Sequence, residues 1–385
     1  MKDETRVTHG GNDVSQDIKI VNTPVYRAST VLFPTAESLK DFSRTYVYGR
    51  RGTPTSRALE TAIAELEGGE HTVLLPSGLA AISCALLAVL KTGDHVLLTD
   101  TVYAPNRHFC DKFLSRMGIS ASYYDPKVGA GISELFQPNT RAVFVETPGS
   151  LTFELQDLPA IAAAAKARGI YTLVDNTWAS PLYFKPLAHG ADISIQAATK
   201  YVVGHSDVML GMITASGEAA KAVYEAHGHL GQHVSPDDVY LGLRGLRTLG
   251  ARMPRHYDNA MKVARWLEGR PEVDRVLYPA LESFPDHEIW KRDFTGASGT
   301  FGVILKPVPK PAVYALLDGL KLFSLGYSFG GYESLAILSD PGAQRSLTKW
   351  TDAPTLRLHI GLEDAGDIMA DLEAGFVRLG EVAGA

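Results

Sequence analysis

Residues 192–207 read DISIQAATKYVVGHSD, where an apolar run leads to Lys200 and a Gly-rich polar turn follows. The run has the length and composition of a buried β-strand. An earlier strand of the same kind, residues 171–176 (YTLVDN), carries Asp175 near its end. The ligands of open α/β sheets gather at the carboxyl ends of the strands. We therefore expect Lys200 and Asp175 to lie together at one edge of a sheet.

These two strands belong to a longer alternation of helix and strand between about residues 57 and 215. We expect helices at residues 58–68, 79–93, 106–118 and 158–169, and strands at 95–100, 142–148, 171–176 and 192–200. Apolar strands, each followed by an amphipathic helix that ends at glycine, indicate a mostly parallel sheet covered on both faces. The predicted fold class is α/β, with a three-layer αβα large domain at residues 57–245.

The two ends of the chain follow other patterns. Residues 1–56 show little periodicity and include the polar, aromatic segment YVYGRRGTPT, so we predict an arm that contacts a neighbouring subunit. Residues 236–269 read as one long or kinked helix. A smaller α+β unit follows, built from residues 273–279, 299–306, 311–320, 356–362 and a final helix. We place a C-terminal small domain at residues 246–385.

Composition excludes several classes of protein. A chain of 385 residues with 45% hydrophobic and 21% charged residues is typical of a globular enzyme. The net charge of -6 argues against binding to nucleic acid or to a membrane surface. The N-terminus lacks the apolar core of a secretory signal and no run reaches membrane-spanning length, so we expect a cytoplasmic protein. Cys84 and Cys110 have no metal or redox spacing.

Lys200 and Asp175 together have the chemistry that pyridoxal phosphate requires. Apolar and small neighbours favour the neutral, nucleophilic form of an amine, which forms a Schiff base with an aldehyde. A carboxylate beside a pyridine nitrogen keeps that nitrogen protonated and makes the ring an electron sink. Singly, each residue has an ordinary reading: a lysine at a strand end is usually solvated, and an aspartate there often caps a turn.

Three further residues strengthen the pair. Gly78 follows a short predicted strand and begins a helix, where backbone N–H groups bind phosphate, although a Ser-Gly turn is more often only a cap. Tyr103 follows another strand and can stack on a planar cofactor. Thr199 can donate its hydroxyl to a phosphate. The order and spacing of all five residues are those that one cofactor site requires.

A histidine cluster offers a rival site. His227, His229 and His233 lie close in sequence, but on a helix the first two point apart, and Gly228 and Gly231 weaken the helix itself. We therefore predict no metal site.

Five segments carry a family resemblance: YGRRGTPT, VDNTWASP, QAATKYVVGHSD, SFGGYESL and LRLHIGLED. With them the chain resembles the cysteine and methionine metabolism family of pyridoxal phosphate enzymes over nearly its whole length. The resemblance implies an aspartate-aminotransferase-like fold. It also implies a homotetramer of two close dimers with active sites shared between subunits.

The resemblance also assigns roles. It makes Lys200 the Schiff-base lysine, Asp175 the pyridinium partner and Tyr103 the stacking ring. The groups that it implies for the phosphate are the amides of Gly78 and Leu79, the hydroxyl of Thr199, and Tyr48 and Arg50 of the neighbouring chain. For the substrate it implies Arg357 and Ser328 at the α-carboxylate.

Departures from the γ-acting members point to the β-lyase branch of the family. They are Ala197, Gly149 and Ser150, Trp178, and Tyr327, which stands where those members tend to have glutamate and which we expect at the substrate. This branch implies β-elimination of L-cystathionine, with Tyr103 assisting proton transfer and Arg51 at the distal end of the substrate. Phe329 departs from a tryptophan of some β-lyases, which leaves the distal preference open. The alternatives are chemistry at Cγ or a non-catalytic binding protein.

Overall fold

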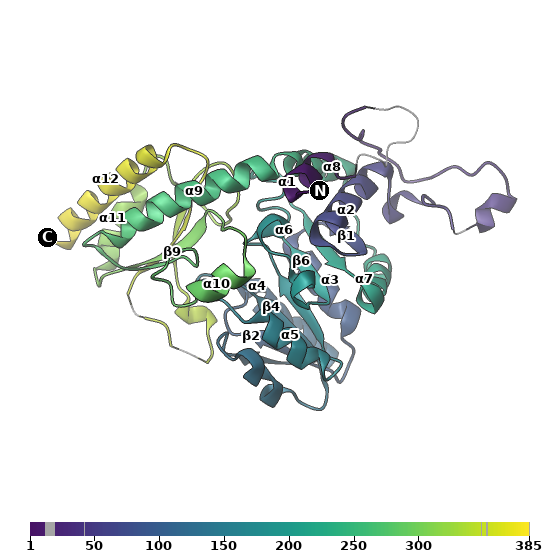
Figure 1. The fold of residues 1–385 in the computed structure, drawn as a ribbon, viewed down its shortest axis with the longest axis horizontal. Coiled ribbons are helices and arrows are strands. Elements are labelled where there is room, and N and C mark those ends of the chain that lie inside the picture. The colour runs from purple at the N-terminus through teal and green to yellow at the C-terminus, as the bar shows by residue number, and fades with distance from the viewer. Residues whose placement is uncertain (12–19, 42, 348, 352, 385) are drawn as a thin grey trace.

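A computed structural model of the protein describes residues 1–11, 20–41, 43–347, 349–351 and 353–384. Residues 12–19 and 42 of the predicted arm, and 348, 352 and 385 of the predicted C-terminal domain, lie outside the described residues. Figure 1 shows two regions of mixed helix and strand joined by a long helix, with the C-terminus at the far end of the second region.

The first sheet has seven strands within the described residues, in the order β1-β7-β6-β5-β4-β2-β3. Strand β7 pairs antiparallel with both of its neighbours, and the other pairs are parallel. The strands are β1 (His71–Leu75), β2 (His95–Thr99), β3 (Ser120–Tyr124), β4 (Thr140–Glu146), β5 (Tyr171–Asp175), β6 (Ile193–Gln196) and β7 (Gly211–Ala215). The mostly parallel sheet is confirmed, although β3 and β7 were not predicted.

Helices cover both faces of this sheet because side chains alternate along its strands. Val96 and Leu98 belong to the apolar cluster under one set of helices, whereas Leu97 belongs to the cluster on the other face. The helices on the first face include α3 (Gly78–Val89), α4 (Ala104–His108) and α7 (Gly217–His229); those on the second include α2 (Pro54–Glu67), α5 (Leu158–Lys166), α6 (Ser180–Tyr183) and α8 (Pro236–Arg247). The three-layer α/β class is confirmed.

The second sheet has five strands within the described residues, in the order β10-β11-β12-β9-β8. They are β8 (Val273–Leu277), β9 (Thr300–Leu305), β10 (Ser324–Leu325), β11 (Leu335–Ser339) and β12 (Thr355–His359). Its helices are α10 (His287–Asp293), α11 (Lys310–Asp318) and α12 (Ala365–Ala383). Strands β8, β9 and β12 match predicted segments, whereas β10 and β11 do not.

The predicted helix at 236–269 is two helices, α8 and α9 (Leu249–Glu268), which meet at Thr248. The predicted boundary between residues 245 and 246 falls within the last turn of α8. Helix α8 packs with the first region, whereas α9 extends to β8 and α12 in the second. These contacts are in keeping with the boundary, which remains a prediction.

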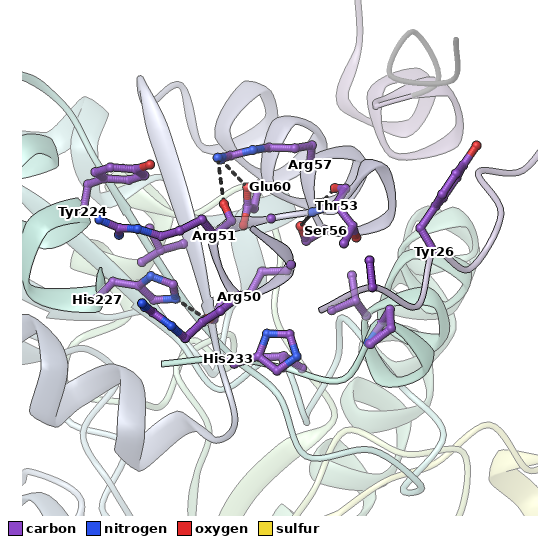
Figure 2. Close-up of a pocket in the computed structure, with 18 residues that line it drawn as sticks. Tyr26, Arg50, Arg51, Thr53, Ser56, Arg57, Glu60, Tyr224, His227 and His233 are labelled. Carbon is purple, nitrogen blue, oxygen red and sulfur yellow. Dashed lines mark hydrogen bonds and ion pairs between the residues drawn. The ribbon is translucent and has the colours of Figure 1, made fainter. Parts of the chain in front are cut away.

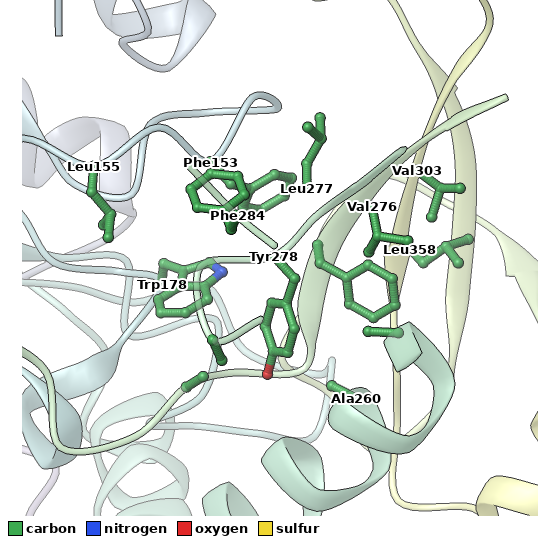
Figure 3. Close-up of a cluster of buried hydrophobic side chains, with 14 of the residues drawn as sticks. Phe153, Leu155, Trp178, Ala260, Val276, Leu277, Tyr278, Phe284, Val303 and Leu358 are labelled. Atoms are coloured by element: carbon green, nitrogen blue, oxygen red, sulfur yellow. The ribbon is translucent and has the colours of Figure 1, made fainter. Parts of the chain in front are cut away.

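A single apolar cluster joins the two regions. Trp178, which follows β5, packs edge-on against Tyr278 and Phe294 of the second region. Its indole Nε1 donates a hydrogen bond to the carbonyl of Thr300 at 2.8 Å. Figure 3 shows Trp178 and Tyr278 together with Leu155, which follows β4, and Val276 of β8. The same apolar cluster includes Val143 and Val174 of the first sheet. The core therefore continues from one sheet to the other.

The N-terminal segment divides into two parts. Helix α1 (Asp3–His9) packs on its own chain, with Val7 buried against α2 and α9. Part of the described segment at residues 20–41 instead extends away from the body (Figure 1), and Val21 and Leu32 are 92% and 84% exposed. Across the described residues, no helix combines the length and apolar character that crossing a membrane requires.

Candidate active site

Lys200 and Asp175 lie at neighbouring strand ends of the first sheet. Asp175 is the last residue of β5 and pairs with Ile195 of β6, and Lys200 follows four residues after β6 ends. The two side chains are close enough for each charge to act on the pKa of the other. The topology thus brings the amine and the carboxylate to one edge.

Lys200 occupies a mostly buried position. Its Nζ donates a hydrogen bond to Ser328 Oγ at 2.6 Å and lies 5.0 Å from the centre of the Phe329 ring. Burial, aided by the positive charge of Arg357, lowers the pKa of Lys200 to about 8, and Asp175 partly opposes this shift. The lowered pKa makes about a tenth of the amine neutral near pH 7, far more than for an ordinary lysine, and the neutral form is the one that acts as a nucleophile or base.

Asp175 is buried and held by Thr177. Asp175 Oδ1 accepts hydrogen bonds from the Thr177 amide at 2.9 Å and from its hydroxyl at 2.5 Å. Burial raises the pKa of Asp175, while these hydrogen bonds and Lys200 lower it. Burial makes this acid costly to ionise. A neighbouring cation such as a pyridinium would stabilise its carboxylate form.

Glu146 is a site residue that our sequence reasoning missed. It ends β4 directly beside Asp175 in the strand register, and its Oε2 accepts a hydrogen bond from the Tyr103 amide at 2.7 Å. Burial and the nearby Asp175 raise its pKa well above the usual range. A signal was available, because AVFVE ends in an acid just as YTLVD does and parallel strands end at one edge.

Tyr103 stands at this edge with its ring 43% exposed. Burial, with the charges of Glu146 and Asp175, raises the pKa of its phenol, and Arg357 lowers it. The hydroxyl therefore stays protonated near neutral pH and can donate a proton rather than accept one.

Arg357 and Ser328 reach Lys200 from the second region of the chain. Arg357 is the middle residue of β12, and its Nη2 donates a hydrogen bond to the Ser328 carbonyl at 2.9 Å. Burial lowers the pKa of Arg357. Ser328 has a φ of 114°, a conformation that costs a non-glycine residue about 1–3 kcal/mol and tends to occur at functional sites. A guanidinium here can bind a carboxylate through two parallel hydrogen bonds.

The start of α3 offers backbone N–H groups to an anion. Ser77 is its N-cap and accepts a hydrogen bond from the Ala80 amide at 3.1 Å, which leaves the first amides of the helix, Gly78 and Leu79, without intrahelical acceptors. A Cβ on Gly78 would lie 2.6 Å from the Cβ of Ala197, so only glycine fits this close approach.

Thr199 is engaged differently from our expectation. Its hydroxyl donates to the carbonyl of Leu210 at 3.1 Å and accepts from the Leu210 amide at 2.8 Å. To donate to a phosphate, this hydroxyl would have to release the Leu210 carbonyl. The role predicted for Thr199 therefore requires a change in its hydrogen bonds.

These residues fit pyridoxal phosphate. Lys200 supplies the amine, Asp175 a buried acid suited to a pyridinium, and Gly78 a helix start suited to a phosphate. The exposed ring of Tyr103 offers a stacking surface. The chemistry of this donor set therefore matches the three parts of the cofactor.

Three residues predicted for this site lie elsewhere on the chain. Arg50 Nη1 donates to the carbonyl of Gly228 at 3.0 Å, and the guanidinium of Arg51 lies 5.3 Å from the centre of the Tyr224 ring. Figure 2 shows both arginines in a cavity between α2 and α7, whose described lining contains neither Lys200 nor Asp175. Tyr48 is half exposed just before them. Within one chain, these side chains are not at Lys200.

The remaining residues that the sequence suggests are Tyr327, the histidines around residue 230, and His205 in the Gly-rich turn after Lys200. Tyr327 is 89% exposed beside Ser328. Among the described residues, no three histidine, cysteine or acidic side chains gather as metal ligands. His227 Nε2 is hydrogen-bonded to the carbonyl of Leu74, and His205 Nδ1 to that of Val203. Both rings thus have structural partners.

Comparisons with known proteins extend over nearly the whole chain. Residues 4–377 match the model of a family described as Cys/Met metabolism PLP-dependent enzymes. The chain is 44% identical to the cystathionine β-lyase MetC of Escherichia coli, covering 98% of each chain. It is 40% identical to an L-alanine/L-glutamate racemase of Wolbachia pipientis, covering 98% of each chain.

A solved structure agrees in fold. The crystal structure of metB from Corynebacterium glutamicum superposes with a TM-score of 0.92 at 32% identity and covers 98% of each chain. Similarity in sequence and in fold leads to one conclusion. The chain belongs to the Cys/Met metabolism family of pyridoxal phosphate-dependent enzymes.

Proposed function

We propose that this protein cleaves the Cβ–S bond of L-cystathionine, releasing L-homocysteine, pyruvate and ammonia in methionine biosynthesis. The observation that carries the proposal is the buried amine of Lys200, whose pKa is lowered to about 8 and which donates a hydrogen bond to Ser328 within range of the charges of Asp175 and Arg357. The full-length similarity to the E. coli enzyme supports the choice of substrate. Other β-thio amino acids are expected to react as well, because the contacts described above address only the common amino-acid end.

Each side chain has a task in this reaction. Pyridoxal phosphate, when bound, supplies an aldehyde for the substrate amine and a protonated ring that withdraws electrons from Cα. Arg357 binds the α-carboxylate, helped by Ser328, and so fixes the orientation of the Cα–H bond. Asp175 holds the ring nitrogen protonated, and the amides of Gly78 and Leu79 bind the phosphate.

The proton transfers fall to Lys200 and Tyr103. The neutral amine of Lys200 removes the α-proton, and the Cβ–S bond then breaks with its electron pair leaving on sulfur. The phenol of Tyr103, which stays protonated, is placed to assist transfer of a proton to that thiolate. The remaining three-carbon enamine takes up one water and yields pyruvate and ammonia.

Product identification tests the reaction. Incubation of the holoenzyme with L-cystathionine is expected to give pyruvate and homocysteine in equal amounts, because bond cleavage at Cβ leaves a three-carbon keto acid. Mass spectrometry after derivatisation measures both. Formation of 2-oxobutyrate and cysteine would instead show chemistry at Cγ, and absence of any product together with absence of a visible cofactor band would indicate a binding protein.

Racemisation is a second candidate activity. It is favoured by the similarity to the Wolbachia pipientis racemase over nearly the full chain. Racemisation and β-elimination both begin when an α-proton is removed, but a substrate without a leaving group can only regain that proton. Chiral chromatography of L-alanine after incubation with the holoenzyme measures this activity separately from cystathionine cleavage.

The same proposal includes a cytoplasmic homotetramer whose active sites are shared between neighbouring subunits. Two observations support the sharing: the extended segment exposes apolar side chains such as Val21 and Leu32, and Arg50 is not at the Lys200 of its own chain. The two buried cysteines, Cys84 and Cys110, are free thiols, as is usual in a reducing compartment.

Subunit complementation tests the sharing. Lys200→Ala and Arg50→Ala chains, each weakly active alone, are coexpressed with different affinity tags. If Arg50 serves the neighbour, each mixed dimer has one intact site, so the mixture is expected to recover about a quarter of the original activity. If Arg50 served its own chain, every site would carry a defect and no activity would return. Light scattering on the same samples measures the number of subunits.

A further inference from the structure

Two side chains of β12 hold one short segment of the site. Arg357 and His359 are two residues apart on the strand and so face the same side of the sheet. Arg357 contacts the carbonyl of Ser328, while His359 contacts the backbone at Gly330 and Gly331. We call residues 328–331 the carboxylate segment, after the substrate α-carboxylate that Ser328 is proposed to bind.

The carboxylate segment lies directly on the backbone of Lys200. Gly330 has a φ of 86°, and a Cβ there would lie 2.8 Å from the Lys200 carbonyl carbon. Ser328, two residues earlier, also has a positive φ. Backbone of this kind persists only where the surroundings hold it in place. Something other than local preference must therefore fix the segment.

His359 supplies that restraint in either tautomer. Its Nε2 lies 3.0 Å from the Gly331 carbonyl, to which a protonated Nε2 donates. The same atom lies 3.1 Å from the Gly330 amide, from which an unprotonated Nε2 accepts. Full burial and the nearby His256 lower the pKa of His359 well below its usual value, so the ring stays neutral.

The other ring nitrogen is anchored to the residue after Lys200. His359 Nδ1 lies 3.2 Å from the Thr300 hydroxyl, which lies 3.0 Å from the hydroxyl of Tyr201. All three side chains are at most 1% exposed. A buried chain of hydrogen bonds thus runs from Tyr201 through Thr300 and His359 to the carboxylate segment, and breaking one link leaves polar groups unpaired.

We propose that His359 is a positioning residue, which holds the carboxylate segment against Lys200 and thereby keeps the Ser328 hydroxyl at the Lys200 amine. The inference rests on the proposed roles of Lys200 and Ser328. It adds that the placement of both depends on a side chain that itself touches neither cofactor nor substrate.

The first test measures Lys200 directly in the cofactor-free, full-length chain. Reductive methylation with formaldehyde and cyanoborohydride is followed at a series of pH values, and mass spectrometry gives the extent of modification at Lys200. The original chain is expected to show a midpoint near the lowered pKa of about 8. In His359→Leu the loosened segment admits water, so the midpoint is expected to rise by about one pH unit or more.

His359→Gln is the matched variant. A glutamine amide can donate and accept at the same place, so its Lys200 midpoint is expected to stay within about 0.3 pH unit of the original. On the holoenzyme, kcat/KM for L-cystathionine is expected to fall about tenfold or more in His359→Leu and about threefold or less in His359→Gln. A core residue without a positioning role would show no such difference between the variants.

Thr300→Val keeps the test decisive if His359→Leu does not fold. It removes the hydroxyl between Tyr201 and His359 at nearly constant volume, and a smaller rise of the Lys200 midpoint is expected. An unchanged midpoint in every folded variant would overturn the proposal. Because methylation uses no substrate, a protein that fails to cleave cystathionine would still report on His359.

Discussion

Lys200→Ala is expected to lower turnover of L-cystathionine by at least about 1,000-fold. The substitution removes the amine that takes the α-proton, and positioned acid–base groups contribute about 100- to 10,000-fold to enzymatic rates. No second lysine contacts Ser328 or Phe329 among the described residues, so none can replace Lys200 in place. Pyruvate release, measured with lactate dehydrogenase, gives the rate.

Two controls accompany this variant. Lys112→Ala removes an exposed lysine after α4 and is expected to retain full turnover. Circular dichroism of Lys200→Ala is expected to match the original, because burial of the amine costs stability and its removal therefore does not weaken the fold. A Lys200→Ala protein that keeps more than about a tenth of the rate would refute the acid–base role.

Asp175→Asn is expected to weaken binding of pyridoxal phosphate at least about 100-fold. The carboxylate would face a buried pyridinium, and removing one partner of such a pair costs about 3–5 kcal/mol, where 1.4 kcal/mol is a factor of ten. Equilibrium dialysis of the cofactor measures the change. Turnover at saturating cofactor is expected to fall as well, because an unprotonated ring withdraws electrons less strongly.

Glu146→Gln is the matched comparison within the site. Burial and Asp175 raise the pKa of Glu146 well above the usual range, which favours the neutral acid over the carboxylate. A neutral amide therefore changes the charge little, and cofactor affinity is expected to fall less than about tenfold. Asp274→Asn, on the exposed side of β8, controls for the substitution itself. Equal losses at Asp175 and Glu146 would mean that the two acids share the pyridinium.

Much of this site was predictable because strands of a parallel sheet deliver their last residues to one edge. That rule placed Asp175 and Lys200 near one another from two short patterns of sequence. Applied once more, it would also have included Glu146. The three-layer fold followed from the same alternation of apolar strands and amphipathic helices, whereas β7 was missed because its apolar stretch is short and its direction is reversed.

Other features could not be read from local pattern. His359 stands in the same short strand as Arg357, but a lone histidine there gives no signal of its own. Its contacts depend on how β9 and the carboxylate segment come together in space. The engagement of Thr199 by Leu210 is likewise set by a partner eleven residues away. Contacts of this kind depend on how distant segments pack together, and the periodicity of the sequence does not reveal them.

The indole of Trp178 has a wider consequence. Trp178 lies three residues after Asp175, the last residue of β5. Its indole Nε1 donates a hydrogen bond to the carbonyl of Thr300, the first residue of β9 in the second sheet. The surrounding apolar cluster contains buried side chains from both regions (Figure 3). The second region therefore cannot swing freely about the first, and the cofactor side and the carboxylate side should lose their structure in one cooperative step.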